Sequence, residues 1–74
     1  MGRVSDRSAA RAARSALVTR LSAVPGVVAI GLARRESDYV VKVDLADAAT
    51  AARVPPDVDG VRVVTEVIGA VRPL

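Results

Sequence analysis

Residues 39–57 read YVVKVDLADAATAARVPPD, and this segment decides the fold. In residues 39–45, every second side chain is large and apolar, and the residues between them include a lysine and an aspartate. This period of two predicts a half-buried strand. Asp44 or Asp47 can cap a short Ala-rich helix over residues 46–53, and the Pro-Pro pair that follows must end it. A strand followed by a helical crossover predicts that the next strand runs parallel to this one.

The segments on either side read as further strands. Residues 27–35 are rich in β-branched side chains and follow a Pro-Gly pair, and the polar residues 34–38 are typical of a turn. Two strands joined by a few polar residues predict a hairpin. After an expected turn at residues 57–60, residues 61–71 alternate again and predict the final strand.

An amphipathic helix is predicted over residues 5–23, which contain no Gly or Pro and consist mainly of Ala, Arg, Ser and Leu. Ser5 is its expected N-cap. At about 100° per residue, small apolar side chains gather on one face of this helix. The opposite face holds four basic residues at spacings of four, four and three: Arg3, Arg7, Arg11 and Arg14.

We therefore predict one small α+β domain over residues 1–74, with a basic amphipathic helix in 1–24 and a ββαβ body in 25–74. The element order is α-β-β-α-β. The strands are expected to form a mixed three-stranded sheet in the order 2-1-3, with the first strand in the centre and both helices on one face. This arrangement resembles half of a ferredoxin-like or KH-like fold.

The residue types that are missing exclude most kinds of catalysis. The chain has no Cys and no His, so it lacks a thiolate nucleophile, a Ser-His or Cys-His pair and the usual zinc ligands. We expect no enzyme activity, no cofactor and no metal site. Asp57 and Asp59 are expected to bond the backbone of a turn rather than a cation. Because one Tyr is the only aromatic residue, a base-stacking surface for nucleic acid is also excluded.

The net charge of +3 comes from the N-terminal segment. Residues 1–20 hold five Arg and one Asp, whereas residues 21–74 hold six basic residues against seven acidic ones. No apolar run is long enough for a secretion signal or a membrane span, which points to a cytoplasmic protein without a membrane partner. The Arg- and Ser-rich start is also similar to an organelle transit peptide, but its removal would leave too little helix to cover a sheet.

Three segments carry a resemblance to a known family. They are PGVVAIGL at residues 25–32, YVVKV at 39–43 and VPPDVDGVRV at 54–63. From residue 25 onward the chain resembles the small α+β segment that precedes the catalytic domain in bacterial trypsin-like serine peptidases. The 74 residues include no peptidase domain, so the resemblance implies no catalysis. It implies an accessory, adaptor or prosegment-like domain that works with a separate peptidase or other effector.

Two further resemblances lack the residues that would carry function. The topology is similar to that of RNA-binding KH modules, but their Gly-x-x-Gly loop between two helices is absent. The Pro-Gly-Val opening of the first strand is similar to heavy-metal-associated domains, but their paired cysteines are absent. The remaining way to bind nucleic acid is an electrostatic contact between the basic face of the N-terminal helix and phosphates.

The expected function is that of a non-catalytic interaction or assembly module. The core must be thin, and self-association is a common remedy for a small core, so we expect a homo-oligomer. Association could pair strand edges or cover an apolar sheet face, with Val40, Val64 and Ile68 as the candidate contacts. One alternative is nucleic-acid binding through the basic helix face, and another is a role as a peptidase accessory domain.

Overall fold

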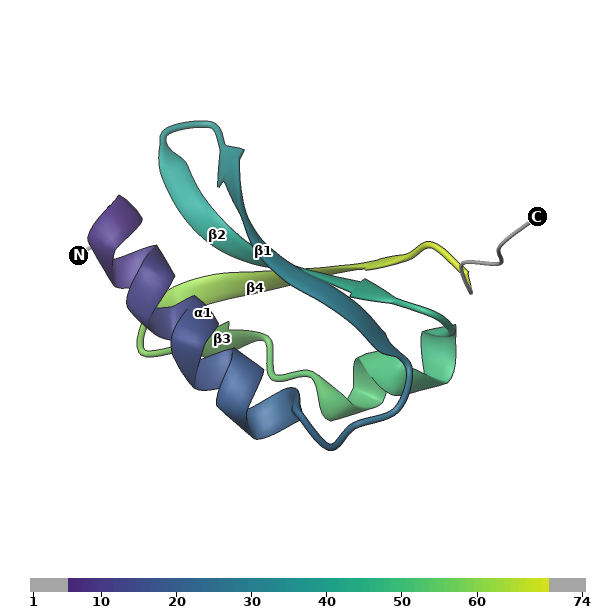
Figure 1. Cartoon of the computed structure of the whole chain (residues 1–74). Coiled ribbons are helices and arrows are strands. Elements are labelled where there is room, and N and C mark those ends of the chain that lie inside the picture. Colours follow the sequence, from purple (N-terminus) through teal and green to yellow (C-terminus); the bar gives the residue numbers. More distant parts are fainter. Residues whose placement is uncertain (1–5, 70–74) are drawn as a thin grey trace.

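The computed structural model describes residues 6–69, and within them the predicted elements occur in the predicted order with one short strand added. The element that the sequence predicted as a second α-helix is a 3-10 helix, labelled η1. In chain order the elements are α1 (Arg7–Leu21), β1 (Val27–Arg35), β2 (Asp38–Leu45), η1 (Ala48–Arg53), β3 (Asp57–Val58) and β4 (Val61–Val67). The fold is thus a small α+β domain with a mixed sheet (Figure 1).

The strand order corrects the sequence-based prediction. The described residues form a four-stranded sheet in the order β1-β2-β4-β3, so the second strand, not the first, lies inside the sheet. β1 and β2 form an antiparallel hairpin, and β2 and β4 pair in parallel, as the crossover predicted. The physical reason is that β2 is apolar on both faces at Val40 and Val41, whereas β1 ends in two exposed arginines. A strand that is buried on both faces takes an inner position.

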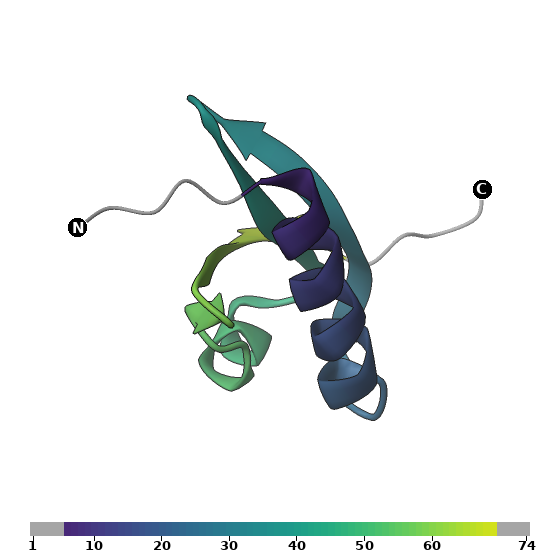
Figure 2. The ribbon, with the colours of Figure 1, turned by 90° about the vertical axis from the view of Figure 1, so that its left-hand side faces the viewer.

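The helix α1 packs across one face of the β1–β2 hairpin (Figures 1 and 2). Its N-cap is Asp6, whose carboxylate Oδ1 accepts a hydrogen bond of 2.7 Å from the backbone N–H of Ala9. The predicted cap, Ser5, lies outside the described residues. The helix ends at Leu21, two residues before the predicted end, and Ser22 Oγ donates to the carbonyl of Thr19 at 3.0 Å.

The hydrophobic core lies between α1 and the sheet. The helix contributes two alanines and two leucines to the core. The strand β2 contributes every second residue, Val41, Val43 and Leu45. Ala51 of η1 packs against the same cluster. The buried core residues are Ala10, Ala13, Leu17, Leu21, Val41, Val43, Leu45, Val58, Val61 and Val63.

Two turns set the ends of the strands. Asp59 and Gly60 have φ of 52° and 81°, and Val58 pairs with Val61 across them. This is the Asp-Gly pattern of a two-residue hairpin, and it is why part of the segment predicted as a turn is the short strand β3. β4 ends at Val67 and not at residue 71, because Gly69 adopts a φ of 78° that extended strands do not allow. Residues 70 and 71 lie outside the described part.

The Asp47 side chain organises the start of η1. Its Oδ1 accepts hydrogen bonds from the backbone N–H of Thr50 at 2.9 Å and from Thr50 Oγ1 at 2.7 Å. These two bonds hold the pKa of the Asp47 carboxyl below its usual value, chiefly through the Thr50 hydroxyl. Of the two capping aspartates that the sequence offered, Asp47 is therefore the one used.

Candidate functional site

The three apolar residues predicted as contacts do not form one surface. Val40 and Val64 lie on the outer face of the sheet, which we define as the face turned away from α1, because they alternate with residues that enter the core. Ile68 follows the end of β4. Val40 is only 1% exposed, Val64 is half-buried, and Ile68 is 44% exposed. Val40 is therefore no surface residue, contrary to the expectation from sequence.

Charged side chains interrupt the outer face between these residues. Lys42 Nζ lies 3.0 Å from Glu66 Oε1 on β4 and 3.5 Å from Asp44 Oδ1 on its own strand. The hydrogen bond to Glu66, together with the negative charges of Asp44 and Glu66, raises the pKa of Lys42 above its usual value. The ammonium form is thereby favoured, which is the opposite of what a catalytic lysine base requires. The outer face is a mixed surface rather than an apolar one.

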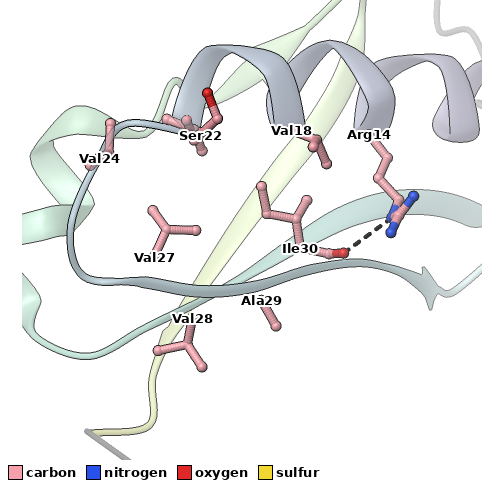
Figure 3. A pocket seen from close by; sticks show the side chains of 9 residues that line it. Arg14, Val18, Ser22, Val24, Val27, Val28, Ala29 and Ile30 are labelled. Atoms are coloured by element: carbon pink, nitrogen blue, oxygen red, sulfur yellow. Dashed lines mark hydrogen bonds between the residues drawn. The ribbon is translucent and has the colours of Figure 1, made fainter.

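The basic face of α1 is present, but one of its members is engaged. Arg7, Arg11 and Arg14 are exposed along the helix, and Arg3 lies outside the described residues. Arg14 Nε donates a hydrogen bond of 3.1 Å to the backbone carbonyl of Ile30 in β1 (Figure 3). Among residues 6–69, no Arg forms an ion pair with an Asp or Glu side chain. The positive charges along α1 are therefore not neutralised by the domain itself.

The strand β1 has one free edge. Across residues 6–69 it pairs only with β2, and its other edge faces α1 and solvent. The Ile30 carbonyl points to this free edge, since it accepts the bond from Arg14. Because backbone groups alternate in direction along an antiparallel strand, Leu32 and Arg34 also turn their N–H and C=O groups outward. Three residues thus turn backbone groups to the free edge along one line, and the Ile30 carbonyl is the one that Arg14 already bonds.

A groove of about 300 Å³ lies between this edge and the C-terminal half of α1. In Figure 3, Val18 from the helix and Val27 and Ile30 from the strand point toward one another across it, whereas Val28 points to the other side of the strand. Arg14 lies at the end of the groove nearer the N-terminus of α1. We call this feature, together with the free edge of β1, the edge groove.

The sequence carried a partial signal for the edge groove that was not recognised. Arg14 and Val18 of α1 and its C-cap Ser22 line it and are spaced four residues apart along one side of the helix. Arg7 and Arg11 continue the same line toward the N-terminus. The sequence-based prediction assigned the basic part of this stripe to contacts with phosphates. It placed β1 in the centre of the sheet, so it predicted no free edge beside the helix.

No family model matches the chain, and neither a curated protein nor a solved structure matches it. The resemblance to peptidase-associated segments therefore stays a prediction. Within residues 6–69, no helix combines the length and apolar character needed to cross a bilayer. In the same part of the chain, no three acidic side chains gather in a way that could hold a metal ion.

Proposed function

We propose that this protein is a non-catalytic interaction module that binds an extended segment of a partner by strand addition in the edge groove. The observation that carries the proposal is the free edge of β1, nine residues long, beside an apolar groove. In strand addition, main-chain hydrogen bonds supply affinity, and pockets for alternate side chains supply specificity. The edge groove offers both, and such a surface would also serve the separate effector that the peptidase resemblance implies.

The other end of the sheet is less suited to this role. Its edge strand, β3, has only two residues, and short edge strands are a common protection against unwanted pairing. Next to it, the backbone N–H of Val63 in β4 donates to the carbonyl of Pro56 at 2.9 Å, so this part of the β4 edge is already bonded. Figure 2 shows η1 and β3 gathered on the other side of the domain from α1, and none of the residues that line the edge groove belongs to either element.

Leu32 offers a test of strand addition, because its N–H is the middle one of the three that face outward. Leu32→Pro removes this donor without breaking a bond to β2, whereas Leu32→Ala removes the side chain and keeps the donor. Peptides selected from a displayed random nonapeptide library are expected to bind the unchanged chain and Leu32→Ala. They are expected to bind Leu32→Pro at least about tenfold more weakly, the loss of about 1.4 kcal/mol.

Folding of both variants is checked by circular dichroism, and the contact is mapped by amide chemical shifts. Shifts on peptide addition should concentrate on Ile30, Leu32 and Arg34. Equal binding by Leu32→Pro and Leu32→Ala, or shifts confined to the outer face, would show that the peptide does not add to β1.

Self-association is a second candidate, and it is favoured by a different observation. Val28, Val67 and Ile68 are 42%, 51% and 44% exposed, and all three lie at the same end of the sheet, because Val27, Leu45 and Val67 are in register. Light scattering is expected to show a dimer whose mass falls to that of the monomer in Ile68→Lys. The control Thr65→Lys places the same charge on an exposed β4 residue outside the patch. A monomer at every concentration would remove this candidate.

A further inference from the structure

We infer that the segment that binds the edge groove is acidic: an extended peptide that carries carboxylates at one end and apolar side chains at the other. This inference rests on the proposed strand addition and names the chemistry of the partner. Both walls of the edge groove, α1 and β1, contain arginines and no Asp or Glu. Because both walls are positively charged and neither contains an acidic residue, they are complementary to a negatively charged segment.

The charges along the edge groove have a direction. Arg14 stands beside Ile30, and Arg11 and Arg7 continue the helix stripe away from the apolar part. On the strand side, β1 runs in the same direction to Arg34 at the hairpin end. The other end of the groove is formed by Val18, Val24 and Val27. A paired segment would therefore meet apolar side chains near the start of β1 and arginines near its end.

The hydrogen bond from Arg14 fits an exchange on binding. In the unbound domain, Arg14 donates a hydrogen bond to the Ile30 carbonyl. A partner strand would need the same carbonyl as an acceptor. When a partner N–H takes this carbonyl, the guanidinium is released beside the new strand. A carboxylate on that strand would then accept from Arg14, and hydrogen bonds between charged groups are stronger than the one that is lost. A segment with an apolar or basic residue there would leave Arg14, which is exposed, to bond water alone.

The same charges argue against two other occupants. A second copy paired through its own β1 edge would bring together two walls that both carry arginines, and neither wall has an Asp or Glu to complement them. A nucleic acid would meet phosphate-binding arginines on α1, but it would use neither the apolar floor nor the outward N–H groups of Leu32 and Arg34. The features of the edge groove taken together fit a peptide better than a duplex.

The test is a selection from displayed random nonapeptides against the unchanged chain, with counter-selection against Leu32→Pro. The enriched sequences are expected to be net acidic, with apolar residues grouped toward one end. The most enriched peptide, synthesised and measured by fluorescence anisotropy, should bind Arg11→Glu and Arg14→Glu about tenfold more weakly. Arg53→Glu is the matched control, because it changes the net charge equally on an exposed residue of η1 and should leave the affinity unchanged.

The possible results separate the inference from the proposed function. Enriched peptides without an acidic bias, with Arg11→Glu and Arg53→Glu equal in affinity, would overturn the acidic partner and leave strand addition intact. No enrichment over Leu32→Pro would overturn both. Binding of a duplex oligonucleotide that Arg11→Glu abolishes and Leu32→Pro does not affect, with no peptide enriched, would overturn both in favour of a nucleic-acid partner.

Discussion

Replacing Leu17 by alanine is expected to remove about 3 kcal/mol from the free energy of unfolding. Leu17 is fully buried, and the helix that carries it contacts the sheet mainly through small side chains. Ala10 and Ala13 allow close approach but bury little apolar area, so Leu17 and Leu21 supply most of the attachment. Removing Leu17 therefore takes away a large part of what holds α1 on the sheet.

The loss is large in relation to the whole domain. A chain of 74 residues is expected to have a total stability of about 4 to 11 kcal/mol. A separate helix of 15 residues is marginal in water, so α1 depends on packing rather than on its own propensity. We expect a fraction of Leu17→Ala molecules to have α1 detached, and these would also lose one wall of the edge groove.

Val18→Ala is the matched control, because Val18 is the next residue, is 42% exposed and faces the groove rather than the core. It is expected to lower the stability by less than about 1 kcal/mol. Urea unfolding followed by circular dichroism at 222 nm, a wavelength dominated by helix, measures both variants. Equal losses for Leu17→Ala and Val18→Ala would mean that α1 is attached through a different face.

Local patterns predicted the elements well, because they depend on neighbours in the chain. The strand at residues 27–35 has the predicted bounds, and the hairpin and the parallel crossover occur as predicted. The helix was also found, although its cap moved to Asp6 and its end to Leu21. Each of these features follows from side-chain period, turn residues or capping, which a short window of sequence contains.

Strand order and the edge groove could not be predicted in the same way. Which strand lies inside the sheet depends on how much of each strand is buried on both faces, and Val40 gives no local sign that it is buried. The hydrogen bond from Arg14 to Ile30 joins residues 16 apart and exists only because α1 crosses the free edge of β1. The candidate site exists only because β1 lies at the edge of the sheet, so a wrong strand order leaves no free edge from which to predict it.

Replacing Gly26 by alanine is expected to lower the stability by about 2 to 5 kcal/mol, for two separable reasons. Gly26 has a φ of 96°, which disfavours any side chain by about 1 to 2 kcal/mol. A Cβ at this position would also overlap Thr50 Oγ1, the hydroxyl that bonds Asp47 at the start of η1. Overpacking of this kind costs about 1 to 3 kcal/mol. The turn before β1 and the start of η1 therefore pack closely because Gly26 has no side chain.

Two other glycines isolate the two causes. Gly60→Ala has a similar φ of 81° but open space around the new Cβ, so it is expected to show the backbone cost alone, about 1 to 2 kcal/mol. Gly31→Ala has open space and no positive φ, and it is expected to be neutral or slightly stabilising. A cycle with Thr50→Ala measures the overlap with the hydroxyl: in that background the cost of Gly26→Ala should fall close to that of Gly60→Ala. Equal costs of Gly26→Ala with and without Thr50 would mean that backbone strain alone demands glycine there, and that the turn and η1 are not coupled through this contact.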